Sequence, residues 1–280
     1  MKLISLQGNS QMLDAGAMFG NAPKALWSRW VETDALNRMS IACRCLLATD
    51  FNGKNVLFET GIGAFFEPKL KQRFGVKEPN HVLLDSLKQH GMTHEDIDFV
   101  VLSHLHFDHA GGLLSAYEDG KEPELLFPNA KYLVSEKHWH RAINPHPRDR
   151  ASFIPKLNAL LEQSGRLVFV NDSSCDLLPG VTFEFTDGHT PGMMHSTIAD
   201  VVFCADLIPG KAWIHVPISM GYDRFPELLI DEKTNFLNEH SQLNHRFFFT
   251  HDPEISVAKT VLNEGRFSTT DEQKILLEER

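Results

Sequence analysis

The chain has 280 residues, of which 42% are hydrophobic, and its formal net charge is −10 with histidine counted as neutral. This length allows one or two domains, and the hydrophobic content is ordinary for a globular protein with a substantial core. The acidic balance and the absence of a basic tract argue against nucleic acid or an anionic membrane surface as a partner.

The N-terminus and the cysteines favour a cytoplasmic location. The chain begins like a signal peptide, but Gln7, Asn9 and Gln11 interrupt the apolar run before a long hydrophobic region can form. No later run is long enough to span a bilayer. The four cysteines contain no zinc-type Cys-x-x-Cys pair, and buried free thiols in a reducing compartment are the better interpretation. We therefore expect a cytoplasmic protein with no membrane partner.

The part of the chain before residue 97 is predicted to contain three strands and one helix. A strand opens the chain, and two more, over 40–47 and 56–59, are joined through the turn signal Asn52-Gly53. A helix is predicted over 80–90, with Asn80 as its N-cap.

Residues 9–36 form an irregular stretch that is rich in large apolar side chains. Two interpretations compete for this segment. It packs as ordinary core, or it forms a lid or a dimer segment beside the site, where Trp27 and Trp30 would meet an acyl or aryl group. We favour the first interpretation, although the apolar stretch also suggests a homodimer.

A buried strand predicted over 97–102 is followed by Ser-His-Leu-His-Phe-Asp-His-Ala-Gly-Gly. Four of these side chains are imidazole or carboxylate: His104, His106, Asp108 and His109. Zinc, iron and manganese accept such ligands. Because side chains alternate along an extended strand, His104 and His106 point the same way. A turn, made possible by Gly111-Gly112, is needed to aim the other two inward. The segment therefore predicts a metal site.

Strands and helices alternate after the motif. Strands are predicted over 131–135, 167–170, 181–185, 197–206 and 246–250. Helices are predicted over 136–141, 153–165, 227–243, 257–264 and 270–279. His138, His140 and His146 fall in a polar region, and we expect them on the surface or in support of a ligand. Groups of strands flanked by helices on both sides of the motif suit a four-layer α/β arrangement.

The pattern His-x-His-x-Asp-His after a hydrophobic strand resembles the signature of the metallo-β-lactamase superfamily. Three later segments fit the same resemblance in the same order: Gly188-His189-Thr190-Pro191-Gly192, a strand that ends at Asp206, and a strand followed by His251. The resemblance implies an α/β fold, a four-layer αββα sandwich with a two-metal site at one edge. It favours a single hydrolase domain over residues 1–280.

The resemblance also implies a role for each ligand. One metal ion would be held by His104, His106 and His189, the other by Asp108, His109 and His251, and Asp206 would bridge the two. The expected cofactors are two divalent metal ions, zinc first, although manganese, iron and cobalt also fit. A metal-bridging hydroxide would be the nucleophile, with Asp108 and Asp206 as catalytic carboxylates. Glu59, where the family usually carries Asp, would either orient a ligand histidine or be a satisfied buried acid.

The branch that the chain resembles contains N-acyl homoserine lactonases and methyl parathion hydrolase-like enzymes. It implies hydrolysis of a lactone, such as an N-acyl homoserine lactone in quorum quenching, or of a related small-molecule ester. Several such lactonases carry a Tyr soon after the bridging Asp, whereas this chain has Leu207-Ile208-Pro209-Gly210. The residues considered for substrate contact are Trp27, Phe107, Tyr222 and His215.

Other functions remain as alternatives. An aryl phosphotriesterase or a thioesterase on the same scaffold is the enzymatic alternative, and a metabolite- or protein-binding scaffold is the non-enzymatic one. The presence of all seven implied ligands favours an enzyme. A flavodiiron-type redox protein is disfavoured because that group carries Glu at the position of His106. The net charge of −10 disfavours a nuclease.

Overall fold

The computed structural model describes residues 1–280, which divide into two compact units. Unit 1 consists of Met1–Gln11, Ala42–Asn171 and Leu276–Arg280. Unit 2 consists of Met12–Ile41 and Asp172–Ile275. Each unit is thus assembled from separated stretches of the sequence and has its own sheet and helices. None of the helices combines the length and the apolar character that crossing a membrane requires.

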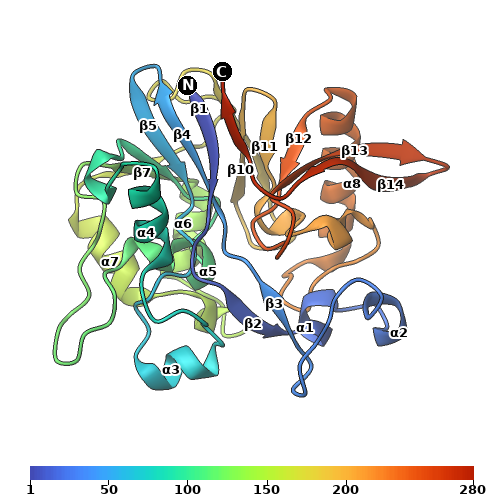
Figure 1. Cartoon of the computed structure of the whole chain (residues 1–280), viewed down its shortest axis with the longest axis horizontal. Coiled ribbons are helices and arrows are strands. Elements are labelled where there is room, and N and C mark those ends of the chain that lie inside the picture. Colours follow the sequence, from blue (N-terminus) through green and yellow to red (C-terminus); the bar gives the residue numbers. More distant parts are fainter. The chain divides into compact units, whose positions relative to one another are not determined.

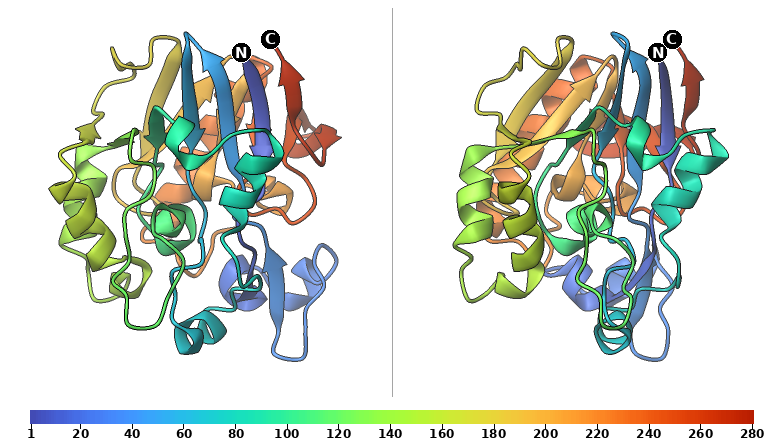
Figure 2. Two further views of the ribbon diagram at one scale, coloured as in Figure 1. Left: turned by 60° about the vertical axis from the view of Figure 1, so that its left-hand side comes forward. Right: turned by 90° about the vertical axis from the view of Figure 1, so that its left-hand side faces the viewer.

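Unit 1 is built on a seven-stranded mixed sheet with the strand order β15-β1-β4-β5-β6-β7-β8. The strands are β1 (Lys2–Leu6), β4 (Cys45–Phe51), β5 (Lys54–Phe58), β6 (Phe99–Val101), β7 (Lys131–Val134), β8 (Leu167–Phe169) and β15 (Leu277–Glu279). Neighbours from β15 to β5 are antiparallel, whereas β5 to β8 run parallel. Figure 2 shows β1, β4 and β5 side by side in shades of blue. The histidine motif follows β6, at the carboxyl edge of the parallel part, where α/β sheets commonly carry their sites.

The helices of unit 1 include one whose capping differs from the prediction. They are α3 (Pro68–Arg73), α4 (Val82–Gln89), α5 (Phe107–Ala110), α6 (Glu136–Ile143) and α7 (Pro155–Gln163), with short 3-10 helices η1 (His94–Asp96), η2 (Gly111–Leu113) and η3 (Arg150–Ser152). α4 confirms the helix predicted over 80–90, but its N-cap position is His81, not Asn80. The side chain of Asn9 accepts the Val82 N–H at 3.0 Å from 73 residues away. A tertiary contact therefore replaces the expected local cap.

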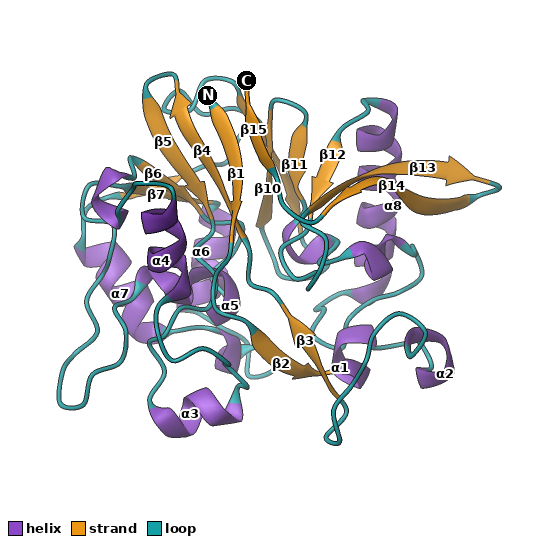
Figure 3. Ribbon diagram, viewed as in Figure 1, coloured by secondary structure: helices purple, strands orange, loops and turns teal.

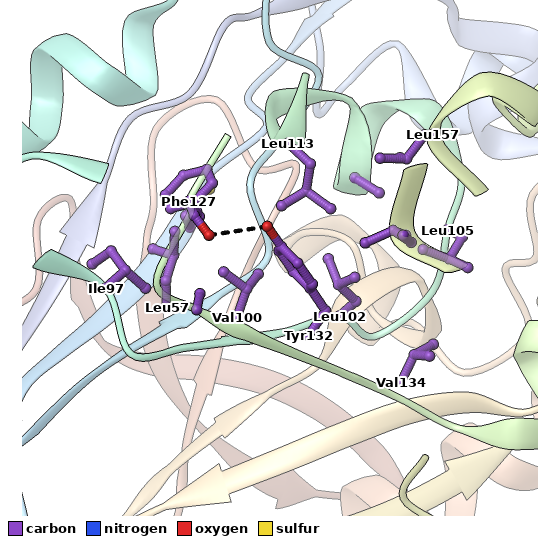
Figure 4. Packing of buried hydrophobic residues seen from close by; sticks show 14 of the residues in the cluster. Leu57, Ile97, Val100, Leu102, Leu105, Leu113, Phe127, Tyr132, Val134 and Leu157 are labelled. Atoms are coloured by element: carbon purple, nitrogen blue, oxygen red, sulfur yellow. Dashed lines mark hydrogen bonds between the residues drawn. The ribbon is translucent and has the colours of Figure 1, made fainter. Parts of the chain in front are cut away.

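The hydrophobic core of unit 1 extends into the histidine motif. Leu105 belongs to the same buried cluster as Val100 and Tyr132, as Figure 4 shows. The Tyr132 hydroxyl donates to the Leu126 carbonyl at 2.6 Å and lies 3.0 Å from the Phe127 carbonyl oxygen. Burial of one large apolar side chain contributes about 1.5–3 kcal/mol. The core thus anchors the backbone between the two histidines that flank Leu105.

Unit 2 is built on a six-stranded mixed sheet with the strand order β14-β13-β12-β11-β10-β9 (Figure 1). The strands are β9 (Val181–Thr186), β10 (Met193–Ile198), β11 (Val201–Phe203), β12 (Arg246–Phe248), β13 (Val257–Asn263) and β14 (Arg266–Gln273). Only β11 and β12 are parallel neighbours. A separate two-stranded sheet pairs β2 (Gln11–Asp14) with β3 (Arg38–Ile41). The predicted α/β class is therefore confirmed, with two mixed sheets.

The helices of unit 2 are dominated by one long helix (Figure 3). They are α1 (Ala15–Phe19), α2 (Lys24–Trp27) and α8 (Pro226–Gln242), with 3-10 helices η4 (Ala205–Leu207) and η5 (Lys211–Ile214). α8 has 17 residues and confirms the helix predicted over 227–243. Its buried face includes Leu229, Phe236 and Leu237.

The two C-terminal helices predicted over 257–264 and 270–279 are wrong. These residues instead form β13 and β14, an antiparallel hairpin, followed by β15. The hairpin turns at Glu264-Gly265, where φ is +49° and +75°, values that favour a tight two-residue turn. β13 also pairs with β12, with Phe248 opposite Val257. Pairing with a neighbouring strand outweighs the weak helical spacing that the sequence suggested.

Residues 9–36 contribute part of their apolar surface to the core of unit 2. Phe19 is fully buried and stacks between Trp27, with ring centroids 5.6 Å apart, and Trp213, at 4.6 Å. The Trp213 indole N–H donates to the Met18 carbonyl at 3.0 Å. These contacts favour core packing for α1 and α2. A lid or dimer role for the rest of the segment stays a prediction.

Candidate metal centre

In unit 1, the end of β6 and the first turn of α5 gather four of the implied ligands. His106 has extended backbone angles, φ −65° and ψ 152°, and is the N-cap of α5. The ring centroids of His104 and His106 lie 4.5 Å apart, and those of His104 and His109 lie 3.9 Å apart. The three imidazoles are buried, and the Asp108 side chain is 14% exposed. Strand alternation followed by a helical turn therefore produces the local cluster that the motif predicts.

One buried carboxylate, Glu59, supports two of these histidines. Its Oε2 accepts the hydrogen of His109 Nδ1 at 2.9 Å. Its Oε1 accepts the Ser103 hydroxyl, and Ser103 Oγ lies 2.8 Å from His104 Nδ1. Of the two interpretations for Glu59, the geometry favours the orienting one. Glu59 holds a left-handed φ of +60°, a conformation that costs a non-glycine residue about 1 kcal/mol or more.

Gly111 and Gly112 are required for a reason other than the turn that the sequence suggested. Gly111 has φ −61° and ψ −30°, values that any residue adopts. A Cβ on Gly111 would lie 2.4 Å from the Ile62 carbonyl oxygen, and one on Gly112 would lie 2.0 Å from that of Thr60. The two glycines therefore allow the backbone next to Glu59 to pack directly against the end of the motif.

In unit 2, the other three implied ligands come together around one carboxylate. Asp206 Oδ2 lies 3.2 Å from His189 Nε2, and Asp206 Oδ1 lies 3.2 Å from His251 Nε2. Two ligand atoms of one tetrahedral zinc ion, each about 2.0–2.1 Å from the metal, are about 3.3 Å apart. Each oxygen of Asp206 thus faces a different imidazole at a separation typical of two ligands of one metal ion.

Asp223 orients His189, and the sequence reasoning missed it. Its fully buried Oδ1 accepts the His189 Nδ1 hydrogen at 2.8 Å, which leaves Nε2 as the ring nitrogen with a lone pair. Its Oδ2 accepts the Met220 N–H at 2.6 Å. Asp223 is 34 residues from His189 and belongs to no recognisable motif, so no local signal could have found it.

Backbone packing in unit 2 fixes the three ligands. The turn before His189 is held by Glu232 of α8, whose two oxygens accept the N–H groups of Asp187 and Gly188 at 2.8 Å each. Asp206 lies in η4, directly after β11. His251 follows β12, and its N–H donates to the Pro209 carbonyl at 2.8 Å. The turn held by α8 and the ends of β11 and β12 therefore bring the three ligands together in unit 2.

A buried lysine stabilises the segment between these ligands. Lys233 of α8 is fully buried, and its Nζ donates to the Ile218 carbonyl at 2.5 Å. Burial lowers the pKa of Lys233 to about 8, an effect that the Asp223 carboxylate partly opposes. The buried ammonium ties α8 to the loop that leads to Asp223.

The residues considered for substrate contact differ in exposure. Trp27 is buried in the core of unit 2. Tyr222 is 41% exposed, and His215 is exposed with its ring centroid 5.5 Å from that of Trp30. In unit 1, Phe107 is half-buried, and its ring lies 4.8 Å from that of Phe74. Their substrate role stays a prediction.

The donor chemistry of both groups fits divalent metal ions. The groups consist of imidazoles and carboxylates, which are good ligands for zinc and other first-row divalent metals. His109 and His189 each donate the Nδ1 hydrogen to a buried carboxylate, an arrangement that fixes the ring and directs Nε2 to a cation. Four implied ligands lie in unit 1 and three in unit 2.

Comparison with known proteins identifies relatives over most of the chain. The family described as "Metallo-beta-lactamase superfamily" matches residues 42–251. The N-acyl homoserine lactonase of Bacillus thuringiensis is 27% identical over 110 residues, which is 39% of this chain. That match covers 36% of the lactonase, so the chain matches only about a third of this curated relative's length.

Two solved structures are similar over nearly the whole chain. A probable metal-dependent hydrolase from Staphylococcus aureus is 27% identical, with a TM-score of 0.85 over 99% of this chain and 97% of that one. AidC, a dizinc quorum-quenching lactonase solved with the product N-hexanoyl-L-homoserine, is 24% identical, with a TM-score of 0.76 over 97% of this chain and 94% of its own. The second likeness concerns the fold alone.

Proposed function

The chain belongs to the metallo-β-lactamase superfamily and has its fold, and from that premise we propose that it is a metal-dependent hydrolase. The seven ligands would hold two divalent cations, and zinc is the first expectation. The observation that carries the proposal is the pair of carboxylate-oriented histidines, His109 with Glu59 and His189 with Asp223. The family match spans residues 42–251 and thus includes the ligands of both units.

We propose for each residue the role that the family resemblance implies. His104, His106 and His189 would hold one cation, Asp108, His109 and His251 would hold the other, and Asp206 would contribute to both. When bound, such cations supply Lewis acidity and lower the pKa of a bound water. Asp206 offers one oxygen toward each of two imidazoles at 3.2 Å, which suits a bridging ligand. Asp108 is the most exposed of the unit 1 ligands, and we propose that it accepts a proton from the attacking water.

We further propose a lactone, such as an N-acyl homoserine lactone, or a related ester as the substrate. The support is the 27% identity to an N-acyl homoserine lactonase over 110 residues. Trp30, next to the exposed His215, offers an aromatic surface for an acyl chain. Residues 9–36 would thereby contribute to substrate binding in a single 1–280 hydrolase domain.

The test is hydrolysis of a long-chain N-acyl homoserine lactone, followed by acid release, on protein whose metal content is assayed in the same sample. We expect two metal ions per chain and rapid acid release. Asp206→Asn should lower kcat/KM by about 100-fold or more, because it removes one ligand charge from both cations. Asp200→Asn is the matched control, since Asp200 is a carboxylate of unit 2 that pairs with Arg246 outside the ligand group.

The outcomes distinguish an error in the proposed substrate from an error in the proposed metal-dependent hydrolase. Two metal ions without acid release would reject the lactone as substrate. The assay would then turn to aryl phosphotriesters and thioesters, since this chain lacks the Tyr that several lactonases carry soon after the bridging Asp. A protein that binds no metal ion under metal-replete conditions would reject the hydrolase proposal as a whole.

A further inference from the structure

We propose that His138 is a positioning residue for the metal ligands His104 and His106, an inference that rests on the metal site proposed above. His138 Nε2 accepts the backbone N–H of Leu105 at 2.8 Å. Leu105 lies between the two ligands, so this bond fixes the peptide that sets their common direction. Of the two places expected for His138, the surface or a position that supports a ligand, burial excludes the first, because its side chain is fully buried.

The ring of His138 packs edge to face on the rings of both ligands. The ring of His138 is nearly perpendicular to those of His104, at 5.9 Å and 85°, and His106, at 6.5 Å and 75°. Phe153 packs on both His106, at 5.0 Å, and His138, at 5.9 Å. The backbone of Phe153 also forms an isolated antiparallel bridge with His106. His138 and Phe153 therefore both pack against the His106 ring.

The hydrogen bond specifies the chemistry that position 138 requires. A ring nitrogen that accepts a hydrogen bond carries no proton, so His138 bears its hydrogen on Nδ1. An apolar side chain here would leave the buried Leu105 N–H without its acceptor, a loss of about 1–3 kcal/mol. A glutamine could replace the acceptor, because its Oε1 reaches about as far as an imidazole Nε2.

The imidazole is itself held at a fixed point of the fold. His138 lies in the first turn of α6, where the N-cap Ser135 accepts the His138 N–H with Oγ at 3.0 Å. α6 follows β7, the strand adjacent to β6 in the sheet. The cap of one helix thus determines where the acceptor for the neighbouring motif lies.

The experiment compares His138→Leu and His138→Gln in two measurements. Competition with a chelator gives the affinity for Zn²⁺, and NMR hydrogen exchange in the metal-free protein reports on the Leu105 amide. We expect His138→Leu to weaken Zn²⁺ binding by about 10–100-fold, as loss of a group that orients ligands usually does, and to expose the Leu105 amide to exchange. His138→Gln should restore both. Tyr132→Phe is the control, because it removes another buried side-chain hydrogen bond to backbone in unit 1, one that involves no residue from His104 to His109.

The results distinguish positioning from general stability. Wild-type Zn²⁺ affinity in a folded His138→Leu variant would overturn the proposal, and so would an equal loss in Tyr132→Phe. If His138→Leu fails to fold, a folded His138→Gln variant with weakened Zn²⁺ binding or an unprotected Leu105 amide would overturn it. Metal binding by a wild type that hydrolyses no lactone, ester, thioester or phosphotriester would remove the proposed function but leave this inference intact.

Discussion

At the scale of single residues, buried acids determine which nitrogen each histidine presents. Glu59 contacts His109 directly and His104 through Ser103, so one carboxylate supports ligands that the proposal assigns to different cations. An amide at this position has one acceptor oxygen and can no longer serve both partners.

Glu59→Gln should therefore weaken the binding of both metal ions, by about 10–100-fold. Ser103→Ala should weaken chiefly the cation held by His104, because His109 keeps its direct contact with Glu59. Stepwise removal of zinc with a chelator would measure both effects. Glu118→Gln, an exposed substitution in unit 1, is the control. Identical loss of the two cations in Ser103→Ala would contradict the assignment.

A second residue-scale prediction concerns pH and His195. This histidine is fully buried, and burial lowers its pKa to about 4, with the Glu184 carboxylate partly opposing the effect. Above pH 6.5 the ring is neutral in both states and contributes no pH dependence. As the pH falls from 6.5 to 4, the unfolded chain binds a proton that the folded protein does not, so stability decreases, by about 3 kcal/mol in total.

Urea unfolding at pH 7 and at pH 4.5 would measure this effect in the wild type and in His195→Gln. The variant should lose less stability between the two pH values, since it lacks the titrating ring. Glutamine can still contact Thr186, whose Oγ1 lies 2.9 Å from His195 Nε2. The same pH-dependent loss in both proteins would show that another group is responsible.

At the scale of elements, the loop after β5 packs directly against the end of the motif. The Thr60 N–H donates to the His109 carbonyl at 2.9 Å, and the Gly112 N–H donates to the Gly61 carbonyl at 2.8 Å. Glycine at 112 permits this approach, because a Cβ would lie 2.0 Å from a carbonyl oxygen.

Gly112→Ala should therefore destabilise the protein by about 2 kcal/mol or more and also weaken metal binding, since the contact can be relieved only by moving the motif away from Glu59. Gly120→Ala is the matched control. Gly120 has a positive φ, +74°, and open space around it, so this variant should lose about 1 kcal/mol of stability through backbone strain alone and no metal affinity. Thermal unfolding and zinc titration of both variants give the comparison, and unchanged zinc affinity in Gly112→Ala would refute the coupling.

Comparison of the elements shows which features of the fold and the site could be predicted from the sequence and which could not. The motif from His104 to His109 was predicted because strand end, ligands and turn are adjacent in sequence. Asp223 could not be predicted, because its contact with His189 depends on how the loop before α8 folds back. The strands β13 and β14 were mistaken for helices because their stability comes from pairing with each other and from the pairing of β13 with β12, which local spacing does not encode.

At the scale of the whole molecule, metal binding should contribute to folding stability. A ligand that binds only the folded state at 1,000 times its Kd stabilises it by about 4 kcal/mol. Zinc should therefore raise the Tm of the wild type and a chelator should lower it, whereas the Tm of Asp206→Ala should respond weakly, because that variant lacks the bridging carboxylate. A Tm of the wild type that is insensitive to zinc would contradict the proposed site.

The interleaving of the two units has a consequence for the order of synthesis. Met1–Gln11 and Leu276–Arg280 both belong to unit 1, and all of unit 2 lies between these two segments in the sequence. β1 pairs with β4 on one side and with β15 on the other. A nascent chain on the ribosome therefore carries β1 as an open sheet edge until β15 emerges, and such an edge is a site for pairing with other chains. Pairing of β15 with β1 is thus the step that closes this edge of the unit 1 sheet.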